Sequence, residues 1–207
     1  MAEYFKVHPD NPQERLLEQV ADLFHNGAIM AFPTDSCYAI GCRIGDKEGV
    51  ERIRRLRYLD KNHHFTLMCK DLSDLATYAQ VNKSAYRLLR ANTPGAYTFI
   101  LPASHEVPRR LHHPKRKTIG VRVPTNRIVQ TLLGILGEPI LSITLLLPEF
   151  PEPFTDGEMI REHLDNRLDI IIDGGYSSPE PTTVVDLETA VPQILRVGRG
   201  DPAPFEV

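Results

Sequence analysis

Hydroxyl and carboxylate side chains follow a short apolar segment in the first quarter of the sequence. The run AIMAF predicts a buried strand over residues 28–32, and Pro33 ends it, so that Thr34, Asp35 and Ser36 come directly after the strand. Polar groups beyond strand ends are where open α/β sheets usually bind ligands. The same residue types also form ordinary turns, so the pattern fits both a binding site and a simple turn.

A dense group of cations follows in the segment RIRRLRYLDKNHHF. Arg52, Arg55 and Lys61 exceed the acids near them, and Arg is the side chain best suited to hold phosphate oxygens in a two-pronged fork. Arg55 and Arg57 lie two residues apart, so on a continuing helix they diverge by about 200°. They converge on one anion only if the helix ends between them. A phosphate site and a solvated basic helix face both fit this segment.

Hydroxyls and arginines also occur on the polar faces of several predicted strands. These residues are Thr118, Arg122, Ser142, Thr144, Thr183 and Arg196. Alternate positions of a strand share one face, so the groups fit a single cavity for an anion with hydrogen-bonding substituents, or merely a solvated sheet face. Ser142 and Thr144 favour a site, because their apolar neighbours predict a buried strand and buried hydroxyls need partners.

Two other patterns argue against metal and redox chemistry. The adjacent histidine pairs at 63–64 and 112–113 lack the spacing of helical metal ligands, and no Cys-x-x-Cys is present, so we expect no structural metal. Cys37 and Cys42 lack a redox spacing and are expected to be small buried thiols.

The elements that position these residues alternate between helix and strand. Helices are predicted from Asn11 as N-cap to Gly27 as the residue after the helix, over 47–57, 72–79, 84–91 and 159–164, and from Thr125 as N-cap to Leu136. Strands are predicted over 28–32, 37–41, 66–69, 96–101, 118–124, 139–148, 168–173, 182–187 and 193–198. This order predicts one α/β domain with a mixed sheet over residues 1–207, of which the last seven form a tail.

The composition is that of a globular protein, with 42% apolar and 25% charged residues among 207. The longest apolar run, 139–148, is shorter than the roughly 20 residues of a membrane-spanning helix and contains Ser142 and Thr144. The N-terminus has no secretory signal, and the cysteine count of three is odd. We therefore expect a reduced, cytoplasmic protein that does not bind a membrane.

The net charge of −3 conceals a strong asymmetry along the chain. Residues 43–122 hold 17 of the 24 Lys and Arg but only 7 of the 27 Asp and Glu, a local balance of +10 against −13 for the remainder. Ion pairs on a protein surface stabilise it by only about 0–1 kcal/mol each, so stability alone explains the segregation poorly. The asymmetry favours an anion-binding surface or cavity over incidental pairing within the fold.

Six ordered segments resemble motifs of the YrdC/YciO/Sua family. PTDSCYAIG resembles its opening signature PT-x-T-x-Y-G-L-G and IRRLRYLDKNHHFTLM its Lys-x-Arg-Pro loop, and the others are TPGAYTFIL, KTIGVRVP, PTTVVDL and ILRVGRG. The resemblance covers about residues 14–200 and is strongest to the YciO branch. It implies a YrdC-like single domain, an α/β fold with a twisted, open, mixed sheet, helices packed around it and a large basic cavity.

The resemblance also implies an activity. Members of the family are L-threonylcarbamoyladenylate synthases, which join ATP, L-threonine and bicarbonate to give threonylcarbamoyl-AMP and pyrophosphate, for the modification of tRNA at adenosine 37. Mg²⁺ would accompany ATP. The alternative is a non-catalytic protein that binds double-stranded RNA or tRNA.

The implied site residues fall into two groups, and no catalytic residue is assigned. Nucleotide and phosphate binding is implied for Arg55, Arg57, Lys61, Thr118, Thr144 and Arg196. Threonine binding is implied for Thr34, Thr66, Arg122, Ser142 and Thr182, with Thr183 as the alternative to Thr182 and Arg122 as a fork for the carboxylate.

Departures from the family pattern predict a weak or altered activity. Arg55 stands in place of the usual Lys, and Leu145 and Leu147 stand in place of a usual Ser and Asn. Each lost neutral hydrogen bond removes about 0.5–1.5 kcal/mol, so the two leucines together predict a loss of roughly ten- to a hundredfold in binding or rate. Ala39 in place of a Gly does not disturb the predicted fold.

Overall fold

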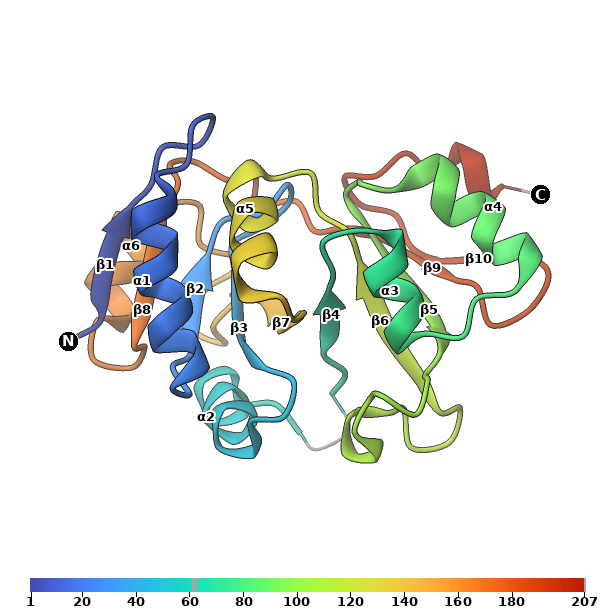
Figure 1. Cartoon of the computed structure of the whole chain (residues 1–207), viewed down its shortest axis with the longest axis horizontal. Helices are drawn as coiled ribbons and strands as arrows, with labels where there is room; N and C mark the ends of the chain where they lie inside the picture. The colour runs from blue at the N-terminus through green and yellow to red at the C-terminus, as the bar shows by residue number, and fades with distance from the viewer. Residues whose placement is uncertain (61–62, 207) are drawn as a thin grey trace.

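The computed structural model describes residues 1–60 and 63–206, and within them ten strands form one open, mixed sheet (Figure 1). The strand order is β1-β8-β2-β3-β7-β4-β6-β5-β9-β10. The strands are β1 (Glu3–Lys6), β2 (Met30–Phe32), β3 (Ala39–Arg43), β4 (Thr66–Met68), β5 (Tyr97–Pro102), β6 (Thr118–Arg122), β7 (Ile140–Thr144), β8 (Ile170–Asp173), β9 (Thr183–Asp186) and β10 (Gln193–Arg196). The α/β class and the mixed sheet predicted from the sequence are confirmed.

Six α-helices pack around the described part of this sheet. They are α1 (Glu14–His25), α2 (Lys47–Arg57), α3 (Leu72–Tyr78), α4 (Lys83–Asn92), α5 (Arg127–Leu136) and α6 (Gly157–Leu164), with 3₁₀ turns at Arg109–Leu111 and Ala203–Phe205. In the described ranges no helix has the length and apolar character needed to cross a membrane.

The sheet buries two apolar clusters, one on each face. Leu67 of β4 and Leu141 of β7 pack in a cluster with residues of α2, α3, α4 and α6. Their neighbours Met68 and Ile140 pack in the other cluster, with α1 and α5. Because successive side chains of a strand point to opposite faces, α1 and α5 cover one face of the sheet and the other four helices cover the opposite face. Figure 1 shows α1 and α5 side by side over the strands near the N-terminal edge.

The helix starts differ from the predicted ones at two caps. The first helix begins at Glu14 after Gln13, so the predicted N-cap at Asn11 is wrong by two residues. The fifth helix is capped by Asn126, whose side chain accepts a hydrogen bond from Val129 N, and the predicted cap at Thr125 is also wrong. Thr125 instead donates hydrogen bonds from its N–H and its hydroxyl to the carboxylate of Asp35.

Both chain ends are more ordered than the sequence suggests. Residues 3–6 form the edge strand β1, paired in parallel with β8, although no strand was predicted there. The expected tail contains Phe205, which is 2% exposed and packs edge-on against Tyr97 and Phe99, with ring centroids 5.4 and 5.8 Å apart. The tail prediction is therefore wrong, because an aromatic anchor buries this segment.

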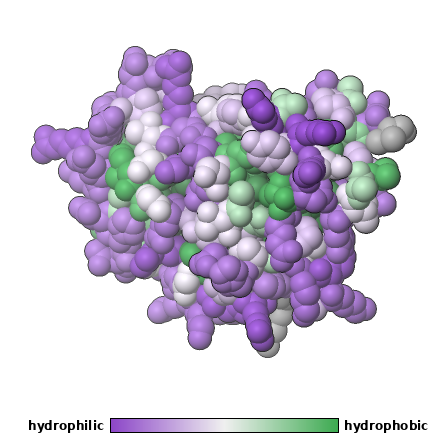
Figure 2. Space-filling model, turned by 45° about the vertical axis from the view of Figure 1, so that its right-hand side comes forward, coloured by the Kyte–Doolittle hydropathy of each residue, from purple (hydrophilic) through white to green (hydrophobic). Residues whose placement is uncertain are grey.

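Most of the surface in the view of Figure 2 is hydrophilic, and apolar side chains gather in a hollowed band across its middle. Strands β3, β7, β4, β6, β5 and β9 are consecutive neighbours in the centre of the sheet. Helices α1 and α5 cover their shared face only in part, which leaves the remainder free to form a site.

Candidate functional site

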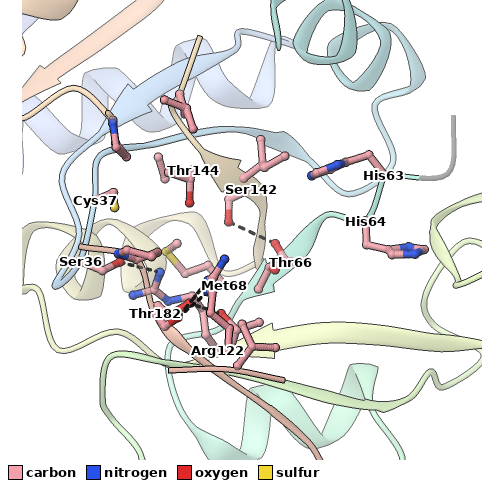
Figure 3. Close-up of a pocket in the computed structure, with 18 of the residues that line it drawn as sticks. Ser36, Cys37, His63, His64, Thr66, Met68, Arg122, Ser142, Thr144 and Thr182 are labelled. Carbon is pink, nitrogen blue, oxygen red and sulfur yellow. Dashed lines mark hydrogen bonds between the residues drawn. The ribbon is translucent and has the colours of Figure 1, made fainter. Parts of the chain in front are cut away.

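A cavity of about 420 Å³ lies on the partly covered face of the central strands. Met68 and Ile140 pack in the cluster beneath α1 and α5, and Met68 also reaches the cavity, which continues along Thr66 and Ser142, two residues away on the same strands. Thr66 is directly opposite Ser142 of β7, and Ser142 Oγ donates to Thr66 O at 3.2 Å. Figure 3 shows hydroxyls from several strands converging on one space. The cavity therefore begins where the cover of the two helices ends.

A glycine keeps the floor of the cavity open. Gly120 of β6 is opposite Thr66 of β4 on one side and Ile100 of β5 on the other. A Cβ at this position would lie 3.0 Å from Thr66 Oγ1, closer than an ordinary contact. The hydroxyl of Thr66 is accessible because Gly120 has no side chain.

Arg122 and Asp35 form a buried ion pair at one end of the cavity. Both side chains are 8% exposed, and Arg122 Nη1 also donates to Ser36 Oγ at 3.3 Å. The second carboxylate oxygen of Asp35 accepts hydrogen bonds from Thr125 N at 2.9 Å and Thr125 Oγ1 at 3.2 Å. Among the described residues nothing accepts a hydrogen bond from the buried Arg122 Nε. The fork of Arg122 is thus shared with Asp35 and not fully free.

Arg57 reaches the cavity from the last position of α2. The helix ends there because Tyr58 adopts the left-handed conformation, with φ of 50°. Arg57 Nη1 donates to Thr144 O at 2.8 Å, and Arg57 Nε donates to Leu146 O. Burial lowers the pKa of Arg57, since a low-dielectric environment penalises its charge. An anion in the cavity would compensate that charge.

Arg196 of β10 is held at the cavity wall by Thr182. Its Nη2 and Nε donate to Thr182 O at 2.9 and 3.1 Å, and Thr182 Oγ1 shares a hydrogen bond of 2.8 Å with Thr98 Oγ1. Although the residue as a whole is exposed, burial of part of the side chain lowers the pKa of Arg196. Within residues 1–60 and 63–206, neither Arg57 nor Arg196 forms an ion pair with a carboxylate.

Most of the residues singled out in the sequence come together here. The cavity is lined by Arg57, Thr66, Arg122, Ser142, Thr144, Thr182 and Arg196. They come from the end of α2, from the neighbouring strands β7, β4 and β6, from the residue before β9, and from β10, which explains how positions up to 139 residues apart in sequence share one space.

Two predicted phosphate ligands, Arg55 and Thr118, do not line the cavity, and a third cannot be placed. Arg55 is exposed, and its Nε is directed to Glu51 O on the helix surface at 3.4 Å. Because α2 continues to Arg57, the two arginines point apart. Thr118 is buried four residues before Arg122, about 13 Å along β6, and lies outside the lining. Lys61 lies outside the described residues.

The hydroxyls of two threonines form hydrogen bonds with backbone groups and do not line the cavity. Thr34 Oγ1 donates to Cys37 O at 2.7 Å and accepts a hydrogen bond from Ser36 N at 3.0 Å, which shapes the turn after β2. Thr183 Oγ1 donates to Gly200 O at 2.5 Å. Neither side chain lines the cavity, so the turn interpretation fits Thr34, while Ser36 reaches the wall instead.

Several wall residues were not predicted from the sequence. They are Cys37, His63, His64 and Thr98. Only Thr98 had a usable signal, since it alternates with the core residues of β5. Burial lowers the pKa values of His63 and His64, and the ring of His64 stacks on His113 with centroids 4.6 Å apart.

The cysteines are free and buried, which confirms the prediction of small buried thiols. Cys37 Sγ donates to Pro179 O at 3.1 Å, and burial raises the pKa of this thiol to about 11. Among the described residues no group of three His, Cys, Asp or Glu side chains is arranged to hold a metal ion.

Arg52 and the two leucines at 145 and 147 have structural roles and do not line the cavity. Arg52 is held by Asp169 in a two-pronged pair, at 2.7 and 2.9 Å. Leu145 and Leu147 are 0% and 1% exposed and pack in the apolar core, whereas Leu146 between them lines the cavity.

Comparisons with known proteins agree with this fold. A family model of the Sua5/YciO/YrdC domain, described as "Telomere recombination", matches residues 22–198. YciO of Escherichia coli (strain K12) is 53% identical over 207 residues, covering 99% of this chain and all of that protein. The crystal structure of E. coli YciO superimposes with a TM-score of 0.95 at 51% identity, covering 100% of both chains.

Two more distant relatives carry names that refer to a reaction or a ligand. The threonylcarbamoyl-AMP synthase of Vibrio campbellii is 29% identical over 185 residues, covering 87% of this chain and 98% of that protein. The crystal structure of P. abyssi Sua5 complexed with L-threonine has a TM-score of 0.87 at 25% identity, covering 95% of this chain and 58% of that one. The chain belongs to the Sua5/YciO/YrdC family.

Proposed function

We propose that this protein binds ATP and L-threonine in the cavity and joins them with bicarbonate to form threonylcarbamoyl-AMP and pyrophosphate. The observation that carries the proposal is the presence of three arginines and a row of hydroxyls on one 420 Å³ cavity. Supporting it, one relative is named a threonylcarbamoyl-AMP synthase and another was crystallised with L-threonine.

In this proposal the phosphates of ATP bind at Arg57 and Arg196. Each of these guanidinium groups is fixed by backbone carbonyls and lacks a carboxylate partner among the described residues. Transfer of a nucleotidyl group needs mainly positioning and neutralisation of developing negative charge, which arginines supply. Mg²⁺ would enter with ATP as part of the substrate, bound through phosphate oxygens and water.

L-Threonine binds near Arg122 in the same proposal. The free N–H groups of Arg122 donate to the carboxylate, and the hydroxyls of Ser142 and Thr66 on the adjacent strands provide further hydrogen bonds. The side chains of Leu145 and Leu147 pack in the core and do not line the cavity, so neither position supplies a hydrogen bond to a ligand, and the reaction runs on the remaining wall residues alone.

Incubation with ATP, L-threonine, bicarbonate and Mg²⁺ tests the proposal directly. We expect pyrophosphate whose release depends on threonine, and threonylcarbamoyl-AMP detected by mass spectrometry. Omission of threonine and the variant Arg57→Ala serve as controls and should abolish both signals. Pyrophosphate release that is absent, or that is the same without threonine, would reject the proposed reaction.

A second candidate function is the binding of duplex RNA, which the surface of α4 favours. Residues 75–105 contain no Asp or Glu. Lys83, Arg87 and Arg90 are exposed on one face of α4 beside Tyr86, which is 46% exposed. These three cations extend over about 10 Å of the helix, a length over which one strand of an RNA duplex carries about three phosphates.

A titration of duplex RNA at several salt concentrations tests this candidate. Replacement of the three α4 cations by Ala should weaken binding and lower the salt dependence by up to three released counterions. The control is Arg15→Ala on α1, also exposed. An affinity without salt dependence would reject the RNA surface.

A further inference from the structure

The three arginines of the cavity differ in how their charges are compensated. Arg122 is paired with Asp35, and both side chains are 8% exposed. Arg57 and Arg196 donate to carbonyl oxygens and have no carboxylate partner in the described part of the chain. One end of the cavity is therefore nearly neutral, while the rest carries uncompensated positive charge.

Asp35 lies behind Arg122 rather than on the cavity wall. It lines a neighbouring open pocket together with Thr125 and Asp201, and it is absent from the lining of the main cavity. One carboxylate oxygen binds Arg122 Nη2, and the other accepts two hydrogen bonds from Thr125. These contacts hold the negative charge in place whether or not a ligand is bound.

Arg122 still has donors for a ligand in this arrangement. Nη1 uses one hydrogen on Ser36 and Nη2 one on Asp35, so each retains a second N–H. The buried Arg122 Nε has no partner among the described residues. The guanidinium thus offers hydrogen bonds to a ligand, while Asp35 cancels much of its attraction for negative charge.

We propose that Asp35 determines the ligand specificity of this end of the cavity. By neutralising Arg122, it makes the site prefer a zwitterionic amino acid over an anion without an amino group. A net-neutral ligand keeps the carboxylate hydrogen bonds of Arg122, and its ammonium group is attracted by Asp35. A plain carboxylate or a phosphate is repelled by Asp35 and binds instead at Arg57 and Arg196.

The inference deepens the proposed function, since it explains how one cavity keeps an amino acid and a triphosphate at separate ends. The identity of the amino acid rests on that function. The effect of Asp35 on anion binding does not, and it can be measured with simple probes.

Calorimetric titrations of the wild type and Asp35→Asn test the inference. The probes are pyrophosphate, L-threonine and 3-hydroxybutyrate, which is threonine without its amino group. Asp35→Asn should bind pyrophosphate and 3-hydroxybutyrate on the order of tenfold more tightly and lose the preference for threonine. Mere structural damage weakens binding, so a gain of anion affinity separates the two effects.

Asp201→Asn is the matched control. Asp201 lines the same neighbouring pocket as Asp35, and Asp201→Asn removes the same charge as Asp35→Asn. The carboxylate of Asp201 accepts a hydrogen bond from Ala203 N, and in the described residues no ion pair joins it to Arg122. This variant should bind all three probes as the wild type does. An equal gain of anion affinity in Asp201→Asn would overturn the specific role of Asp35.

The wild type provides a second measurement if Asp35→Asn fails to fold, which circular dichroism reveals. Wild-type protein should bind L-threonine more tightly than 3-hydroxybutyrate, and equal affinities would overturn the inference. Unchanged pyrophosphate affinity in folded Asp35→Asn would also overturn it, whatever the activity. A gain for pyrophosphate without any threonine binding would support the role of Asp35 and reject the proposed reaction.

Discussion

Arg57 Nη1 donates a hydrogen bond to Thr144 O at 2.8 Å, which joins the end of α2 to the end of β7. The same guanidinium donates from Nε to Leu146 O. Arg57 therefore fixes the polypeptide at the cavity wall, and its remaining N–H groups are the donors that the proposed function assigns to a phosphate. This structural role and the proposed binding role are separable by measurement.

Replacement of Arg57 by Ala should affect both roles. Loss of the hydrogen bonds to Thr144 and Leu146 lowers the free energy of unfolding by about 1–3 kcal/mol, and ATP binding is lost. Urea denaturation and calorimetry with ATP measure the two effects. Normal ATP binding by a folded Arg57→Ala variant would show that this residue is not a phosphate ligand.

Arg55→Ala is the matched control on the same helix. Arg55 is exposed and absent from the cavity lining, so its replacement should change the free energy of unfolding by no more than about 0.5 kcal/mol and leave ATP binding intact. A loss of ATP binding in this variant would restore Arg55 as a ligand.

Restoring the family's Ser and Asn should not restore activity. Leu145 and Leu147 are 0% and 1% exposed and pack in the core, so Leu145→Ser and Leu147→Asn each lower the free energy of unfolding by about 2–5 kcal/mol. Their new polar groups would be buried among apolar side chains. Threonine-dependent pyrophosphate release that rises in either variant would contradict this expectation.

Leu146→Ala is the comparison for these two variants. Leu146 lines the cavity and is half-buried, so its truncation should cost less stability than the core replacements and widen the site. Thermal unfolding of all three variants ranks them, and a larger loss for Leu146→Ala would show that the core position was misassigned.

The strands of the site could be predicted from the sequence, because hydrophobic alternation determines which face each residue occupies. Ser142 and Thr144 follow from that alternation, whereas Thr66 on the neighbouring strand was implied only by the family resemblance. The alternation does not determine which polar positions lie beside a cavity. Thr118 shares the face of Arg122, yet it lies beyond the cavity lining.

The roles of loop residues were harder to predict from the sequence, because their side chains can form hydrogen bonds with either local or distant partners. Thr34 binds the turn that it belongs to, and Ser36 two residues later reaches Arg122. Thr125 binds Asp35, 90 residues away in sequence, which leaves the cap position to Asn126. Such choices depend on tertiary contacts, which residue type and spacing do not specify.

The histidines at the cavity predict a fall in stability at mildly acidic pH. Burial and nearby Arg57 lower the pKa of His63 below its ordinary 6.5, and burial and His113 lower that of His64. Asp60 partly opposes both shifts, while Arg54 adds to the first and Arg116 to the second. Below about pH 6.5 the unfolded chain then binds more protons than the folded one.

The free energy of unfolding should therefore decrease as the pH falls from 7 to 5. The double variant with His63→Gln and His64→Gln should show a shallower decrease, because the two groups that take up these protons are absent. Urea denaturation at several pH values measures both slopes. An equal or steeper slope in the double variant would contradict the assignment.

The thiol of Cys37 should be unreactive in the folded protein at pH 8. Its pKa of about 11 leaves only about 0.1% as thiolate at that pH, and it is 3% exposed. Cys42 has a pKa raised to about 12 by burial, and burial raises that of Cys69 well above its ordinary value. A thiol-specific reagent should therefore titrate three groups rapidly only after denaturation.

The three cysteines also give an internal comparison of the cavity with the core. Cys37 lines the cavity, whereas Cys42 and Cys69 pack in the apolar core. Alkylation at pH 9 followed by peptide mapping should modify Cys37 first, and ATP should slow the reaction of Cys37 without changing that of Cys42. Because global unfolding would expose all three thiols together, selective protection of Cys37 reports occupancy of the cavity, and equal protection of all three would instead indicate general stabilisation by the ligand.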